Sequence, residues 1–332
     1  MAIYEVKDGV GIIPEGTTVI ERSAFMCCTR LTSIVIPDTV TKIENYAFAG
    51  CTGLTSIVIP DSVTEIGIEA FDGCTGVTSL VIGSSLRCFH MSSFGFFKKY
   101  KDLGSIVVSE GNTICDSRNG CNGIISTRKN TLLVGGKNTV IPDSVTEIEM
   151  DAFSGRTGLT SLIIPNSVTK IRTNAFAGCT GLTSIVIPDS VKEIEYEAFK
   201  GCTGLTSIII PDTSTAIIGK EAFSGCTSLT SITIPKSVEL DRSVFEGCTG
   251  LKSASLFAKY IGEGCFEGCT SLETVTVGVG INDLQLVFGL YGRRPALKTI
   301  NVPAKKTDYY KNRLPEEFHG LIVELPAEKK SK

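Results

Sequence analysis

The chain has 332 residues, and its 32 Lys and Arg residues nearly balance its 35 Asp and Glu residues, which leaves a net charge of −3. Without an excess of positive charge, the sequence does not have the electrostatic profile of a nucleic-acid-binding protein. Hydrophobic residues make up 42% of the chain, which is enough to build a buried core and excludes a disordered chain. Aromatic residues make up 7% and Trp is absent, so the side chains that usually anchor tight recognition are few.

The N-terminal segment MAIYEVKDGVGIIPEG lacks the basic stretch followed by an apolar stretch that marks a signal peptide. Either the protein stays where it is made or an export signal has been removed, so a cytoplasmic location stays open. We expect no membrane span, since no run of about eighteen apolar residues occurs. Residues 1–11 precede the regular part of the sequence and are expected to form an N-terminal cap.

From residue 12 onward the sequence repeats itself. The segments CTGLTSIVIPDSVTEIGIEAFDG (51–73) and CTGLTSIVIPDSVKEIEYEAFKG (179–201) are nearly identical, and Phe25, Phe48 and Phe71 follow one another at intervals of 23 residues. A unit of this length cannot close a hydrophobic core by itself, so stacked copies must bury one another's apolar sides. The period therefore predicts a solenoid of stacked coils.

Each unit is expected to hold one short strand and two turns. Ile57 and Ile59 alternate onto one face of the predicted strand, Pro60 ends it, and Gly73 permits the positive φ that turns the chain toward the next coil. We predict an α/β-type repeat solenoid that is right-handed and mostly β, with short turns and helical pieces and a long parallel β-sheet on its concave side. It would form a single domain over residues 1–332.

The period breaks once. Coils are predicted at 12–108 and 140–302, and residues 109–139 do not fit the unit. Short apolar runs with two Asn-Gly pairs predict a β-hairpin inserted into one coil there. Cys115 and Cys121 lie in this insert, and they form either a disulfide or two unpaired thiols.

The C-terminal residues 303–326 are again irregular and predict a cap that covers the open edge of the sheet. A short helix is expected around Tyr309–Leu314 and a last strand at Leu321–Leu325. Residues 327–332 are expected to be a solvated tail.

Thirteen cysteines leave at least one without a partner in the chain. Most of them recur at one place in the unit, where Arg156 stands once instead. Such a cysteine is more often a small buried apolar residue than a redox centre, so we expect reduced thiols. The recurring cysteines are Cys28, Cys51, Cys74, Cys179, Cys202, Cys226, Cys248 and Cys269.

The pattern C-T-x-L-T-S-I-x-I-P-x-S-V-x-x-I-x-x-x-A-F-x-G resembles the BspA-type leucine-rich repeat over about residues 12 to 302. The insert and the ending YYKNRLPEEFHGLIVE are similar to segments of such proteins from host-associated anaerobic bacteria. The resemblance implies a leucine-rich repeat fold without shared catalytic residues. Because founding members are surface adhesins for host matrix proteins such as fibronectin and fibrinogen, it also implies a surface or secreted adhesin. The sequence departs from those members in showing no export signal, cell-wall anchor motif or second module.

The outward side chains of the predicted concave sheet are the first candidate binding surface. An aliphatic stripe beside a row of hydroxyls suits an extended peptide or the edge of a protein. Alternatively, β-branched residues simply suit exposed parallel strands. The stripe comprises Val35, Val58, Val81, Ile163, Val186 and Ile209, followed by Thr233, Ser255 and Thr276, and the hydroxyl row includes Thr55, Ser56, Thr183 and Ser184.

A row of aspartates after the strands offers a second candidate. Stacked carboxylates can chelate Ca²⁺, but an Asp in this position more often caps a turn through its own backbone, so we predict no metal. The row comprises Asp38, Asp61, Asp143, Asp189 and Asp212, and Asn166 and Lys236 interrupt it.

Catalysis has little support in the sequence. The two histidines, His90 and His319, have no nucleophile or acid motif around them, so we predict no enzyme and no cofactor.

A specific partner would favour the irregular surfaces, namely the Phe94–Phe97 region, the insert and the last coils with Tyr260, Leu290 and Tyr291. Alternatively, these segments only adapt imperfect coils. We predict a monomeric, non-enzymatic scaffold of adhesin-like ancestry that binds a protein or peptide. The alternative is an intracellular structural or interaction module without a host ligand.

Overall fold

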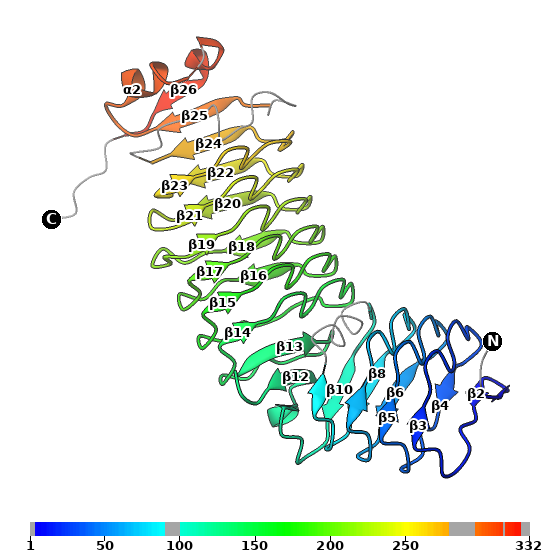
Figure 1. The fold of residues 1–332 in the computed structure, drawn as a ribbon. Coiled ribbons are helices and arrows are strands. Elements are labelled where there is room, and N and C mark those ends of the chain that lie inside the picture. Colours follow the sequence, from blue (N-terminus) through cyan, green and yellow to red (C-terminus); the bar gives the residue numbers. More distant parts are fainter. Residues whose placement is uncertain (1–3, 90–99, 279–295, 315, 327–332) are drawn as a thin grey trace. The chain divides into compact units, whose positions relative to one another are not determined.

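A computed structural model describes residues 4–89, 100–278, 296–314 and 316–326 (Figure 1). The chain forms two compact units, Met1–Leu162 (unit 1) and Ile163–Lys332 (unit 2). In both units successive coils stack through parallel strands, which confirms the predicted repeat solenoid. The prediction of a single domain stays a prediction. His90, the Phe94–Phe97 region, Leu290, Tyr291 and the tail 327–332 lie outside the described residues.

Unit 1 carries a first row of parallel strands, which we call the face row. Its members lie at the predicted strands, except β2, which lies within the predicted N-terminal cap. Val58 lies opposite Val81, and Val81 lies opposite Val107, so equivalent residues of successive coils are in register. At the N-terminal end β1 (Val6–Lys7) runs antiparallel to β2. The face row comprises β2 (Val10–Gly11), β4 (Ser33–Ile34), β6 (Ser56–Ile59), β8 (Ser79–Ile82) and β10 (Ser105–Val108).

A second row of strands follows the first in each coil, where the sequence predicted only a return segment. These strands have two residues each, and they pair in parallel with the equivalent residues of the next coil, as Ile43 does with Ile66. The Ala-Phe step that follows forms turns rather than a helix, and its backbone bonds the next coil, since Phe48 N donates to Ala70 O at 2.7 Å. The second row comprises β3 (Val19–Ile20), β5 (Lys42–Ile43), β7 (Glu65–Ile66) and β9 (Cys88–Phe89).

Unit 2 repeats both rows. Its face row comprises β16 (Ser184–Val186), β18 (Ser207–Ile209), β20 (Ser231–Ile234), β22 (Ser253–Leu256), β24 (Thr274–Val277), β25 (Thr299–Val302) and β26 (Ile322–Glu324). Its second row comprises β15 (Lys170–Ile171), β17 (Glu193–Ile194), β19 (Ile217–Ile218), β21 (Glu239–Leu240) and β23 (Tyr260–Ile261). Ion pairs join neighbouring coils, as between Lys200 and Glu221 at 2.7 Å.

Columns of identical side chains fill the core of each unit. The rings of Phe48 and Phe71 stack with centroids 4.9 Å apart and an angle of 5° between their planes. The recurring cysteines form a second column, and six of them donate to the carbonyl of the preceding coil's phenylalanine, as Cys51 does to Phe25 O at 3.1 Å. These six cysteines therefore serve both as small core residues, as predicted, and as weak donors between coils.

The insert forms an antiparallel sheet in unit 1. β11 (Cys115–Asp116) pairs with β12 (Gly123–Ser126), and β12 pairs with β13 (Thr131–Gly135). β13 then pairs in parallel with β14 (Glu147–Ile148) and so rejoins the coils. The predicted hairpin is present, but its Asn-Gly pairs do not form two-residue turns. The chain passes instead through a 3-10 helix, η3 (Arg118–Gly120), in which Asn119 has a φ of 59°.

The C-terminal cap follows its prediction closely. The helix α2 spans Thr307–Lys311, two residues earlier than expected, and a 3-10 helix η4 (Glu316–Leu321) leads into β26. Tyr310 is buried and donates its hydroxyl to Gly278 O at 2.5 Å. β26 pairs in parallel with β25 and so extends the face row by one strand (Figure 1).

Candidate functional site

The face row of unit 1 presents the predicted aliphatic stripe to solvent. Val35 is 73% exposed and Val58 is 49% exposed, while Val81 is half-buried. Val107 continues the stripe on β10 with an exposure of 46%, although the sequence analysis did not include it. Their neighbours along each strand point inward, since Ile57 and Ile59 are fully buried. The stripe is thus the outer half of a regular strand alternation.

Unit 2 has the same stripe in its first coils and a polar surface beyond. Ile163, Val186 and Ile209 are exposed, although residues 161–165 form no strand. The next strands place hydroxyls and an amide in the equivalent register, so that the apolar stripe is interrupted after β18. These polar residues are Thr233, Ser255, Thr276 and Asn301. The stripe resumes only at Val323 on β26, which lies opposite Asn301 and is 49% exposed.

The threonines of the hydroxyl row hold the coils together. The Thr55 hydroxyl donates to Thr32 O at 3.3 Å, and the Thr206 hydroxyl donates to Thr183 O at 3.0 Å. Their donors are therefore used between coils, and only their acceptor lone pairs face outward. Ser56 and Ser184 begin β6 and β16 beside these threonines, and Ser184 is the more exposed of the two serines.

The aspartate row also bonds between neighbouring coils. Asp61 accepts a hydrogen bond from Ser84 N at 2.7 Å, which lowers the pKa of its carboxyl. Asp189 accepts a bond from the Thr213 hydroxyl at 2.5 Å. Within the described residues no group of three or more His, Cys, Asp or Glu side chains is placed to hold a metal ion. Asp61 and Asp189 thus bond the turn of the following coil, where the sequence predicted a cap through the aspartate's own backbone.

A groove of about 600 Å³ lies where the insert meets β10, and we call it the insert groove. Val107 contributes exposed aliphatic surface to it, and residues of the loop between β11 and β12 also line it. Sequence reasoning singled out the insert but not this groove. Its lining residues are Ile106–Asn112, Asp116–Gly120 and Asn122.

Arg118 organises the loop that borders the insert groove. Its Nε and Nη2 donate to the two oxygens of Asp116 at 2.8 and 2.7 Å, and its Nη1 donates to Asn130 Oδ1 at 2.9 Å. The hydrogen bonds from the Asp116 carboxylate raise the pKa of Arg118. Such a bidentate pair fixes the loop and neutralises both charges.

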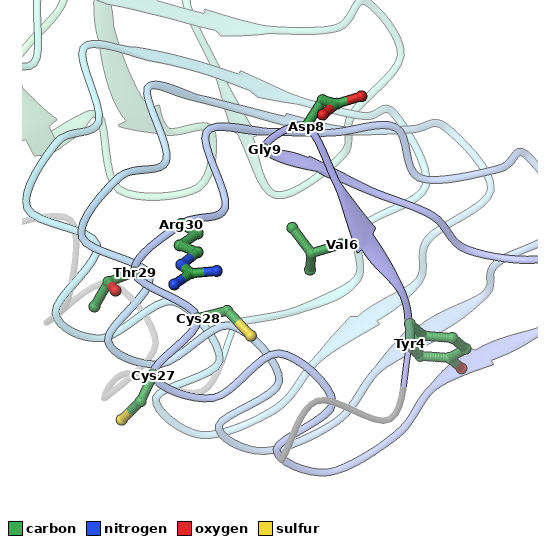
Figure 2. A pocket seen from close by; sticks show the side chains of 8 residues that line it. All are labelled: Tyr4, Val6, Asp8, Gly9, Cys27, Cys28, Thr29 and Arg30. Atoms are coloured by element: carbon green, nitrogen blue, oxygen red, sulfur yellow. The ribbon is translucent and has the colours of Figure 1, made fainter.

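A second pocket, also of about 600 Å³, lies at the N-terminal end of unit 1 (Figure 2). Cys28 is half-buried there, whereas Cys27 turns its thiol away from the other labelled side chains. Burial raises the pKa of the Cys28 thiol, so the thiolate needed for nucleophilic chemistry is disfavoured. Tyr4 stacks on Phe25 with centroids 5.4 Å apart and extends the aromatic column. The pocket is accordingly best explained as the end of the coil stack.

The remaining candidate side chains take part in local structure. Cys115 and Cys121 are buried free thiols: Cys115 Sγ bonds Asn112 Oδ1, and Cys121 Sγ donates to Gly123 O at 3.5 Å. Burial raises the pKa of Cys115 to about 12. His319 Nε2 lies 2.9 Å from Leu314 O within the C-terminal cap. The proposed pairing of the two insert cysteines stays a prediction.

No helix in the described residues has both the length and the hydrophobicity to cross a bilayer.

None of the curated protein sequences is significantly similar to the chain. Solved structures of bacterial repeat proteins are similar in fold, and three of them illustrate this. A leucine-rich repeat protein from Eubacterium ventriosum has a TM-score of 0.57 at 22% identity, covering 87% of this chain and 79% of its own.

The second example is a leucine-rich repeat protein from Bacteroides ovatus, with a TM-score of 0.54 at 23% identity over 95% of this chain and 83% of its own. The pneumococcal vaccine antigen PcpA has a TM-score of 0.53 at 21% identity, covering 90% of this chain and 74% of its own. These likenesses establish the fold. The BspA type leucine-rich repeat region matches residues 13–119, 135–252, 169–288 and 198–312. Because these matches span most of the sequence and the coils stack as that repeat requires, the chain belongs to the BspA-type leucine-rich repeat family.

Proposed function

We propose that the protein is a non-enzymatic scaffold that binds a protein partner through its face rows, in the manner of an adhesin. The exposed aliphatic stripe is the observation that carries this proposal. Val35 and Val186 leave 73% and 52% of their surface in water at equivalent positions of different coils. Contiguous apolar surface on a rigid sheet is typical of protein-binding sites, because covering it removes apolar area from water.

The structure of the stripe suits a partner that lies across several coils. Equivalent side chains recur at the spacing of neighbouring strands, about 4.8 Å, so a partner meets the same contact repeatedly. The threonine hydroxyls beside the stripe already donate between coils, so they offer acceptors to the partner. This combination favours an apolar partner segment with hydrogen-bond donors at its border.

The test measures binding of the full chain to fibronectin and to fibrinogen by surface plasmon resonance. Val35→Lys and Val186→Lys each place a charge on the stripe and are expected to weaken binding at least tenfold. Ile68→Lys and Ile217→Lys are matched controls, since both side chains are exposed but lie off the face rows. Affinity that persists in the stripe variants refutes the face-row site. Absence of binding to both matrix proteins refutes the matrix ligand and favours an interaction module without a host ligand.

A further inference from the structure

We infer that the insert groove of unit 1 binds a basic side chain, arginine or lysine, of the partner protein. The inference rests on the proposed function, because the groove lies at the insert end of the same face row. It adds the chemistry of the group that the partner must present there.

The unpaired charge of the groove is negative. Asp116 and Arg118 neutralise each other through two hydrogen bonds of 2.7 and 2.8 Å. Glu110 is exposed, and it has no hydrogen bond or ion pair with any described residue. The lining residues therefore carry one uncompensated carboxylate, which attracts a cation.

The edge of β10 adds acceptors that lack donors. Ile106 N donates to Asn122 Oδ1 at 3.4 Å, and Val108 N donates to Ser117 Oγ at 3.1 Å, so both N–H groups point toward the insert. The N–H and C=O of one residue lie on the same side of a strand, so both carbonyls point there as well. Among the described residues no donor bonds either carbonyl. Ile106 is only 1% exposed, whereas Val108 keeps 8% of its surface in water, so Val108 O is the carbonyl that a ligand with N–H groups would satisfy.

The loop between β11 and β12 disfavours an anion as the occupant. Three of its backbone N–H groups are already used, because Arg118 N donates to Asp116, Gly120 N donates to Ser117 O and Cys121 N donates to Arg118 O. The Arg118 guanidinium is held by Asp116 and Asn130. The only cationic side chain of the lining is thus occupied, which leaves no free positive charge to bind a phosphate or carboxylate.

Val107 offers an apolar surface for the methylene stem of a long basic side chain. Val107 is 46% exposed and lies in register with Val81 of the stripe. Lysine and arginine place their methylene groups on apolar surface while the charged end reaches polar groups. With its stem on Val107, such a side chain brings its charged end to Glu110 and to Val108 O. The stripe and the groove together then receive an apolar segment that ends in a basic residue.

The test uses N-acetyl-arginine amide as the probe, titrated into the isotopically labelled full chain and followed by amide NMR shifts. We expect saturable shifts at Glu110, Asn119 and Gly120 that weaken as salt is added. N-acetyl-citrulline amide has nearly the same shape without the charge and should bind about two- to fivefold more weakly. Glu110→Gln should weaken the charged probe by a similar factor of about two to five, whereas Glu15→Gln, also an exposed carboxylate but outside the groove, should not.

Equal binding of both probes, an unchanged affinity of Glu110→Gln, or shifts confined to another surface would each overturn the inference. Because Glu110 is exposed, its substitution does not endanger the fold. Val35→Lys separates this inference from the proposed function: the small probe should bind that variant as it binds the unmodified chain. Probe binding without any effect of Val35→Lys on a protein partner removes only the proposed function. Partner binding that depends on Val35, without probe binding, removes only the basic-residue site.

Discussion

Arg156 replaces the recurring cysteine in one coil, and its removal is expected to destabilise unit 1 strongly. The side chain is fully buried and is the largest of the fully buried ones. Its Nε donates to Gly135 O at 2.8 Å, and its Nη1 donates to Tyr100 O at 2.7 Å. Tyr100 in turn donates its hydroxyl to Phe71 O at 2.8 Å, in place of the thiol that bonds this carbonyl in regular coils. The arginine and the tyrosine together substitute for the cysteine column where the period breaks.

The magnitude follows from the acceptors that the change leaves behind. Arg156→Ala removes the guanidinium donor from Gly135 O and from Tyr100 O, and Tyr100 O keeps the bond from Leu103 N at 3.3 Å. One buried carbonyl at most is left unsatisfied, at a cost of about 1–3 kcal/mol. The lost packing of the long side chain adds to this value. Arg156→Cys restores the residue typical of the repeat, yet its short thiol cannot reach both carbonyls, so it should also destabilise by at least about 1 kcal/mol.

The assay is urea unfolding followed by circular dichroism, with the midpoint of the first transition as the readout. Repeat arrays unfold in steps when their coils differ in stability, so a loss in unit 1 appears as an earlier transition. Arg128→Ala is the matched control, because Arg128 is exposed and lies in the insert. A midpoint for Arg156→Ala that equals the control would refute the view that the buried arginine joins the coils.

Two further changes test the packing between coils. In Gly135→Ala the added Cβ would lie 2.0 Å from the Phe153 ring, so overpacking should cost about 1–3 kcal/mol in thermal unfolding, while Gly320→Ala, with open space around it, should change little. A hydrogen bond from Lys200 is the main cause of the lowered pKa of Glu221. A carboxyl whose pKa is lowered by folding stabilises the folded state at pH values above 4.5, the pKa of the carboxyl in the unfolded chain. This stabilisation is lost as the pH falls below 4.5. Glu221→Gln should therefore flatten the acid side of a profile of stability against pH. An equally steep acid limb in the variant would contradict this assignment.

The repeated sequence made the coil stack predictable, because identical residues at a fixed interval must occupy equivalent places. The buried phenylalanine column and the outward position of Val58 follow directly from that interval and from strand alternation. The second row of strands was not predictable in the same way. Each of its members has two residues, such as Lys42–Ile43, and becomes a strand only through pairing with the next coil. A sequence pattern within one unit is too short to show this pairing.

The insert groove has no periodic signal either, since side-chain bonds to a strand edge create it. Ser117 and Asn122 bond the backbone of β10 from a loop whose residues occur nowhere else in the chain's pattern. In sequence, Val107 looks like any other member of the stripe, yet it alone among them lines this groove. A perfect repeat presents the same contact on every coil and cannot fix where a partner begins. The register of a bound partner must therefore be set where the repeat is broken, and in unit 1 the insert beside Glu110 is the place that can set it.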